Sequence, residues 1–90
     1  MIPYYREIQT YLKGENVEKA ELFGSFARGD STSESDIDLL ISKKGMTLFD
    51  ILQMEEDLEK ITNRKIDIVE YSAIKPNLRS YILAHLIPIL

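Results

Sequence analysis

The segment from residue 22 to residue 42 reads LFGSFARGDSTSESDIDLLIS. Its apolar pair, Leu22-Phe23, ends a strand expected over residues 17–23, and the chain then turns at Gly24-Ser25. A short helical turn follows and passes into a polar, turn-rich loop. The strand expected over residues 36–42 is compact, largely apolar and bounded by turn residues. The segment therefore predicts two strands joined by a short helix and a loop.

Helix and strand patterns alternate along the rest of the chain. The expected elements are a helix over residues 3–13 that starts at Pro3, a helix capped by Thr47 and running to about Asn63, a third strand over residues 65–71, and a last helix from Pro76 to about Leu86. The order α-β-α-β-α-β-α predicts a small mixed β-sheet flanked by helices, in the α/β or mixed α+β class.

The helix between Thr47 and Asn63 has an apolar face and a charged face. The residues expected on its buried face are Leu48, Ile51, Leu52, Leu58 and Ile61. The residues expected to face solvent are Glu55, Glu56, Glu59 and Lys60.

Length and composition limit the possible functions. Ninety residues predict one domain over residues 1–90. The net charge of −4 disfavours direct nucleic-acid binding, which needs a basic surface. The chain has no cysteine and one histidine, so thiolate chemistry, cysteine-rich zinc sites and histidine-built metal sites are excluded. No apolar run approaches the ~20 residues of a membrane span, so a cytoplasmic location is expected.

Three aspartates form the first candidate site. Side chains alternate along a strand, so Asp36 and Asp38 project from one face, roughly 6–7 Å apart. Like charges on a half-buried strand repel, so a cation is expected between them. Asp67 lies between Ile66 and Ile68 on the third strand, and it joins the pair if that strand lies beside residues 36–42. Three carboxylates with open water positions suit Mg²⁺.

The turn at Gly24-Ser25 is the second candidate. Glycine lets the backbone approach a ligand closely, and a helix that starts there directs N–H groups outward. Ser25 adds a hydroxyl donor, and Arg28 adds positive charge one turn later. The Gly24-Ser25 turn and the three aspartates together would hold a metal-bound triphosphate, which nucleotidyl or phosphoryl transfer requires.

Each part also has a structural interpretation. Asp-x-Asp alone is a weak signal, Gly-Ser is often only a turn, and Asp67 could pair with Arg64 or Lys65. His85 is interpreted as structural, and the apolar tail to Leu90 either closes the core or docks a partner or a second copy. The joint spacing of Gly-Ser, ten residues, Asp-x-Asp and a later strand aspartate is far more specific than its parts.

Residues 24–29, GSFARG, and residues 35–39, SDIDL, closely resemble the signature of the DNA polymerase β-like nucleotidyltransferase superfamily. The similarity is greatest to the minimal nucleotidyltransferases (MNT) of bacteria and archaea, and it implies the nucleotidyltransferase fold. By this resemblance, Asp36 and Asp38 hold a pair of Mg²⁺ ions, and Asp67 is the third carboxylate, which helps activate the attacking hydroxyl. Gly24, Ser25 and Arg28 bind the phosphates of ATP.

The resemblance also suggests a partner. Larger superfamily members have added domains that hold the acceptor, so we expect another molecule to supply it here. MNT proteins are commonly paired with HEPN-domain toxins, and the MNT antitoxin transfers AMP from ATP to a toxin tyrosine. The alternatives are a non-catalytic module that neutralises a toxin by direct contact and, more weakly, transfer to a small molecule such as an aminoglycoside or to an RNA end.

Overall fold

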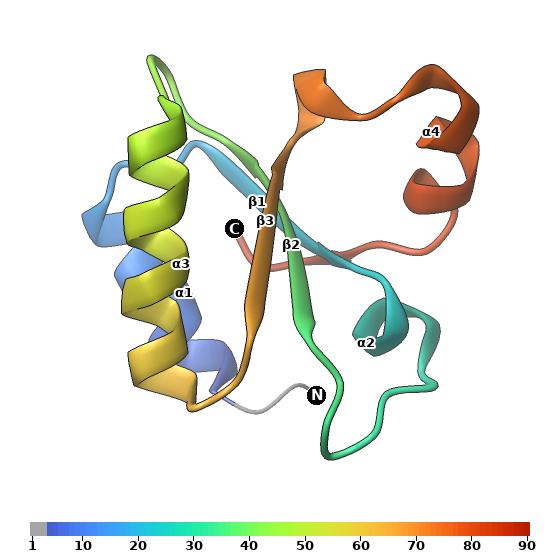
Figure 1. The fold of residues 1–90 in the computed structure, drawn as a ribbon, viewed down its shortest axis with the longest axis horizontal. Coiled ribbons are helices and arrows are strands. Elements are labelled where there is room, and N and C mark those ends of the chain that lie inside the picture. The colour runs from blue at the N-terminus through green and yellow to red at the C-terminus, as the bar shows by residue number, and fades with distance from the viewer. Residues whose placement is uncertain (1–3) are drawn as a thin grey trace.

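A computed structural model describes residues 4–90, so the helix start predicted at Pro3 lies outside the described residues. The elements follow one another in the predicted order, with additions near the C-terminus (Figure 1). They are α1 (Tyr5–Gly14), β1 (Lys19–Phe23), α2 (Ser25–Arg28), β2 (Ile37–Ser42), α3 (Leu48–Thr62), β3 (Ile66–Glu70), the 3₁₀ helix η1 (Tyr71–Ala73), α4 (Pro76–Leu83) and β4 (Ile87–Pro88).

The strands form one mixed sheet in the order β3-β2-β1-β4. β1 pairs antiparallel with β2 and with β4, whereas β2 and β3 run parallel. The parallel pair is joined through α3, as a crossover connection requires. The predicted fold class, a small mixed sheet flanked by helices, is therefore confirmed.

The C-terminal strand β4 was not predicted. The last helix ends at Leu83 rather than near Leu86, because the chain leaves it to pair with β1. Beyond the strand, the N–H of Ile89 donates to the carbonyl of Ala20 at 2.8 Å, and the Ile89 side chain is buried. The interpretation of the apolar tail as closing the core is thus confirmed for Ile89.

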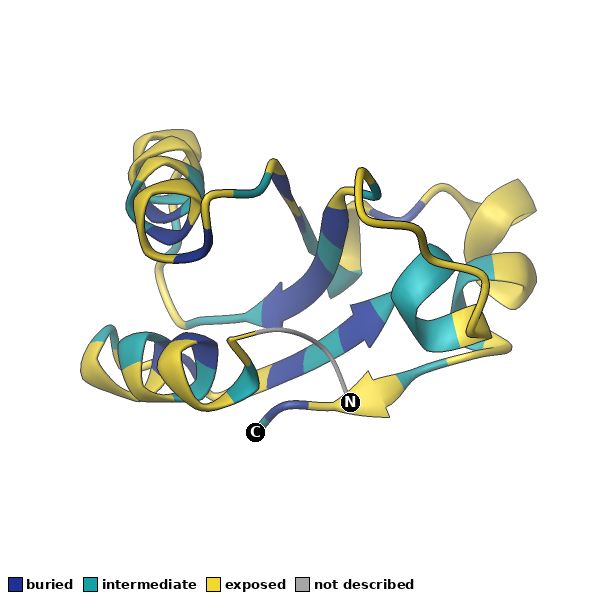
Figure 2. Cartoon of the chain, turned by 90° about the horizontal axis from the view of Figure 1, so that it is seen from below, coloured by how far each residue is buried: buried dark blue, intermediate teal, exposed yellow. Residues whose placement is uncertain are grey.

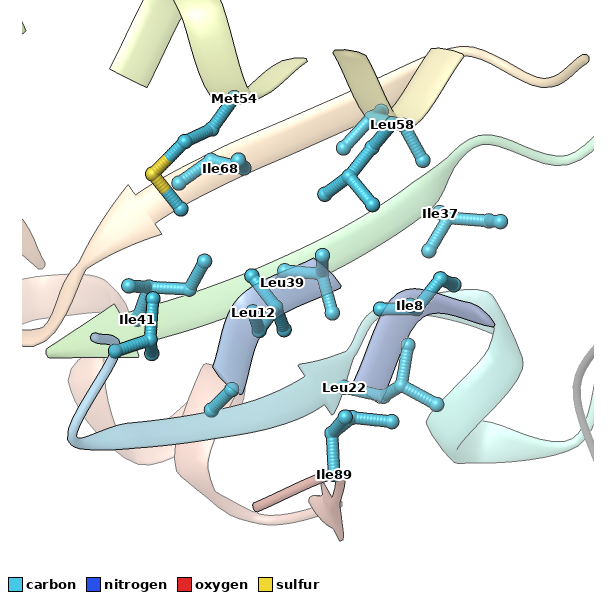
Figure 3. Close-up of a cluster of buried hydrophobic side chains, with 13 residues drawn as sticks. Ile8, Leu12, Leu22, Ile37, Leu39, Ile41, Met54, Leu58, Ile68 and Ile89 are labelled. Carbon is cyan, nitrogen blue, oxygen red and sulfur yellow. The ribbon is translucent and has the colours of Figure 1, made fainter. Parts of the chain in front are cut away.

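The main core lies between the sheet and the helices α1 and α3 (Figures 1 and 3). Ile8 and Leu12 from α1 and Met54 and Leu58 from α3 pack against alternate residues of the strands. The strand residues of this core are Ala20, Leu22, Ile37, Leu39, Ile41, Ile66 and Ile68. Because side chains alternate along a strand, Asp38 and Leu40 face the other side of the sheet.

The other side of the sheet is covered more thinly. Leu40 of β2 and Ile74, which follows η1, are both buried there, and η1 lies against β2. α2 and α4 lie on this side (Figure 1), but α4 contains no buried residue and is almost wholly exposed (Figure 2). Within residues 4–90, no helix combines the length and apolar character needed to cross a membrane.

The helix α3 is rotated relative to the sequence prediction. Its buried residues are Met54, Leu58 and Thr62, while Leu48 and Leu52 are 69% and 52% exposed. Of the five residues predicted to be buried, Leu58 is buried, Ile51 is half-buried, and Leu48, Leu52 and Ile61 are exposed. The prediction of this face was therefore wrong for those three.

Two glutamates explain this rotation. A carboxylate oxygen of Glu55 accepts the N–H of Ile68 at 2.9 Å, and one of Glu59 accepts the N–H of Ile66 at 3.4 Å. β3 is an edge strand, so its outer N–H groups need partners. Both lie along this edge: Glu55 is half-buried rather than exposed, whereas Glu59 is exposed, as predicted, and so are Glu56 and Lys60. The predicted start of α3 at Thr47 is confirmed, since Thr47 and Asp50 form a reciprocal capping box.

The corrected face of α3 predicts unequal effects of two equivalent truncations. Leu58→Ala should lower the free energy of unfolding by about 2–5 kcal/mol, because it opens a cavity in the main core. Leu52→Ala, six residues earlier on the same helix but 52% exposed, should change it by less than about 0.5 kcal/mol. Urea denaturation followed by circular dichroism measures both. Equal losses in the two variants would contradict the observed helix face.

Candidate active site

The turn between β1 and α2 brings the backbone against a carboxylate. Gly24 has φ 72° and ψ −150°, a conformation that residues with side chains rarely adopt. A Cβ atom at Gly24 would also overlap the carboxylate of Asp38. Only glycine therefore fits at this position, and the sequence signal at Gly24 reflects a close approach between the turn and the neighbouring strand.

The sheet register places two of the three aspartates side by side. Asp38 on β2 lies opposite Phe23 on β1 and opposite Asp67 on β3. Registered residues of neighbouring strands share one face and lie about 5 Å apart. Asp36 precedes β2 by one residue and is exposed. The third strand thus lies beside β2, which was the condition for Asp67 to join Asp36 and Asp38.

The electrostatics of Asp38 reflect this crowding. The pKa of the Asp38 carboxyl is raised from 3.8 to about 6, mainly by burial and then by the neighbouring carboxylates of Asp67 and Asp36. Arg28 acts against them. A half-buried carboxylate with two like charges nearby is stabilised by a cation.

Hard divalent cations fit this donor set. Carboxylate oxygens are the ligands that Mg²⁺ prefers, and Mg²⁺ usually keeps several waters and binds through one or two carboxylates together with substrate phosphates. Within residues 4–90, however, no three or more His, Cys, Asp or Glu side chains are grouped so that they alone could hold a metal ion, and the three predicted carboxylates therefore do not form a ready-made metal site. The residues therefore suit an ion that a bound triphosphate helps to hold, rather than a closed protein cage.

A pocket of about 390 Å³ opens beside the turn. Five of the six predicted site residues line it: Gly24, Ser25, Arg28, Asp36 and Asp38. Asp67 is outside this lining and adjoins it through its register with Asp38. The pocket is also lined by Phe23, Ser35, Tyr81, Ile82 and His85. The structure thus gathers the predicted turn and Asp-x-Asp pair around one hollow.

Arg28, at the end of α2, lines the pocket and contacts two residues. Its Nε atom is 3.3 Å from a carboxylate oxygen of Asp30, and its guanidinium is 6.0 Å from the centre of the Tyr81 ring. The ion pair is solvent-exposed, with 34% of the Arg28 side chain and 62% of the Asp30 side chain accessible, so it holds Arg28 only weakly. Arg28 can therefore turn toward an anion in the pocket.

Arg64 does not have the role that the sequence allowed for it as an ion-pair partner of Asp67. Among the ion pairs within residues 4–90, none joins Asp67 to Arg64 or Lys65. Arg64 instead donates to the carbonyl oxygens of Ser35 at 3.2 Å and Thr32 at 3.4 Å, and it stacks 5.4 Å from the centre of the Phe26 ring. It therefore ties the loop before Asp36 to the helix after the Gly-Ser turn. No local motif identifies this role, because the contacts span about thirty residues.

The crowding of Asp38 predicts a gain in stability when its charge is removed. Because its pKa is raised, Asp38 binds its proton more tightly in the folded state than in the unfolded state. Ionisation of Asp38 therefore lowers the free energy of unfolding: the loss is absent below pH 3.8 and complete above about pH 6. Asp38→Asn should therefore stabilise the metal-free protein at pH 8 by about 1 kcal/mol, allowing for solvent screening. Thermal unfolding in EDTA at pH 8 and pH 4 measures this.

The exposed loop residue Glu34 supplies the control for that experiment, because Glu34→Gln removes the same charge away from Asp38. It should leave the midpoint nearly unchanged at both pH values. A destabilised Asp38→Asn protein at pH 8, or a gain as large at pH 4 as at pH 8, would contradict the electrostatic account.

Comparisons with known proteins identify the family of the chain. The family model described as "Polymerase beta, Nucleotidyltransferase" matches residues 6–90. A relative from Methanocaldococcus jannaschii named "Putative protein adenylyltransferase" is 33% identical over 86 residues, which cover 94% of this chain and 92% of the relative.

Solved structures share the fold. A chain of a toxin–antitoxin complex crystallised with AMP-PNP superposes with a TM-score of 0.83 at 17% identity, over 96% of this chain and 72% of that one. A chain of the complex between a tri-AMPylated HEPN toxin of Shewanella oneidensis and its MNT antitoxin gives a TM-score of 0.67 at 12% identity, over 96% and 71%. With the family model covering nearly the whole sequence, the chain belongs to the polymerase β-type nucleotidyltransferases.

Proposed function

We propose that this nucleotidyltransferase moves AMP from ATP onto a hydroxyl group of a partner protein and releases pyrophosphate. The observation that carries the proposal is the pocket that joins the Gly24-Ser25 turn to Asp36 and Asp38. One wall supplies backbone and hydroxyl donors for phosphate oxygens, and the adjoining carboxylates supply ligands for the metal that accompanies a triphosphate.

Each predicted residue has a role in this reaction. Gly24 and Ser25 would hold the phosphate chain, and Arg28 would add a charge that orients it for in-line attack. Asp36 and Asp38, with Asp67 beside them, would hold Mg²⁺, as two ions by resemblance to the family. Bound Mg²⁺ would neutralise charge on the triphosphate and on the leaving pyrophosphate.

Asp67 is suited to the acceptor side of the reaction. It is exposed, lies outside the pocket lining and neighbours Asp38 across the strands. A carboxylate in this place can accept the proton of an incoming hydroxyl while the oxygen attacks the α-phosphorus. The new O–P bond forms as the bond from the α-phosphorus to the bridging oxygen breaks, so pyrophosphate leaves.

The proposed acceptor is a tyrosine of a HEPN-type toxin, which would make this protein an antitoxin acting in the cytoplasm. The M. jannaschii relative carries the name of a protein adenylyltransferase, and one structural neighbour is bound to an AMPylated HEPN toxin. A tyrosine hydroxyl on a folded partner also suits an exposed Asp67 at the edge of the site.

Transfer to a partner can be tested with radiolabelled ATP, Mg²⁺ and a HEPN-type protein from the same organism. Label should appear covalently on a partner tyrosine, and EDTA should abolish it. Asp36→Ala should lower the labelling rate by more than about 100-fold, because the transition-state charge loses its metal support. Gel autoradiography gives the rate, and mass spectrometry gives the modified residue.

Glu34→Gln is the matched control for the loss of one charge on the loop before Asp36, and it should label the partner at the wild-type rate. Wild-type labelling by folded Asp36→Ala protein would contradict the proposed mechanism. A tight complex with the partner that never acquires label would indicate a module that acts by direct contact.

A further inference from the structure

The helix α4 contributes to the pocket without contributing to the core. None of its residues is buried, and Tyr81 is 64% exposed. Tyr81 and Ile82 from this helix nevertheless line the pocket, as does His85 shortly after its end. Figure 2 shows the helix as an exposed element beside the teal ribbon of α2. A fold this small gains little stability from such a helix, so its apolar and aromatic side chains need another explanation.

The two walls of the pocket differ in chemistry. The wall from the motif segments is polar and contains Ser25, Arg28 and the Asp36–Asp38 pair. The wall from α4 presents a phenol ring, a branched aliphatic side chain and an imidazole. The volume of about 390 Å³ falls within the ~300–1,000 Å³ typical of small-molecule sites. On the proposed function, the polar wall would bind the triphosphate together with its Mg²⁺, and the wall with Tyr81 and Ile82 suits a flat, apolar group at the other end of the same ligand.

We propose that the α4 wall binds the nucleotide base, with the base stacked on the Tyr81 ring and hydrogen-bonded on its edge or ribose by His85. This inference rests on the proposed function, and it assigns the end of the substrate that the motif residues leave unbound. The guanidinium of Arg28, 6.0 Å from the Tyr81 ring centre, marks where the phosphate end meets the base end.

The physical basis is the large exposed face of the tyrosine. An aromatic base that stacks on Tyr81 removes apolar surface from water on both partners, a contact worth about a tenfold or greater change in affinity when the ring is deleted. Tyr81 on α4 and His85, two residues past the end of the helix, line the same pocket. The proposal thus gives His85 a binding role, where the sequence favoured a structural one.

The test compares two ligands that share the phosphate end. Isothermal titration calorimetry with Mg²⁺ measures the affinity for ATP and for inorganic tripolyphosphate. Tyr81→Ala should weaken ATP binding about tenfold or more and leave tripolyphosphate binding within about twofold. Tyr81→Phe keeps the ring and should restore most of the ATP affinity. Leu78→Ala removes an exposed apolar side chain of the same helix outside the pocket lining and is the matched control.

His85→Ala tests the other half of the wall. It should weaken ATP binding by a smaller factor, about three- to tenfold, and again spare tripolyphosphate. Circular dichroism should show that the variants stay folded, as expected for exposed positions.

Several results would overturn the inference. An unchanged affinity of Tyr81→Ala for ATP would do so. An equal loss of affinity for ATP and for tripolyphosphate would also do so, because Tyr81 would then act by positioning Arg28 rather than by binding the base. A loss in Tyr81→Phe as large as in Tyr81→Ala would assign the effect to the hydroxyl group. AMP found on Tyr81 by mass spectrometry after incubation with ATP would make it an acceptor. If the wild type binds neither ligand, the proposed function fails as well.

Discussion

The unfavourable placement of the Asp38 carboxylate is the constraint on which the site depends. Asp38 is half-buried against the backbone of Gly24, and Asp67 lies beside it on the parallel strand. Burial and the neighbouring carboxylates raise its pKa to about 6. The fold tolerates this cost because the other face of the same strand is wholly apolar and packs against α1 and α3. The strand β2 thus contributes apolar side chains to the core on one face and the crowded carboxylate of Asp38 on the other.

The two faces of the sheet consequently have different tasks. Long helices cover one face and bury nearly all of the large apolar side chains, whereas α2, η1 and α4 cover the other face incompletely. Because most of the packing that stabilises the fold lies on the face covered by α1 and α3, side chains on the other face can be suited to binding rather than to packing. The tether from Arg64 to Ser35 and Thr32 adds order on that side where the core adds little.

The sequence was most informative where local geometry determines the residue type. Gly24 is predictable because the conformation and the approach of Asp38 both exclude a side chain, and the Asp36–Asp38 pair follows from the period of a strand. The Thr47 cap is equally local. The buried face of α3 was not predictable, because it depends on glutamates that reach the edge of a strand formed later in the chain.

The missed parts of the site share a cause. β4 contains only two residues, one of them a proline, so it has no pattern of its own and exists through pairing with β1. That pairing ends α4 early and helps to bring Tyr81 and His85 to a pocket whose other wall is built more than forty residues earlier. The motif therefore located one wall of the pocket from sequence alone, but the α4 wall required the tertiary fold. On the proposed function, the residues that would bind the phosphates belong to the local motif, whereas those proposed to bind the base come together only through long-range packing.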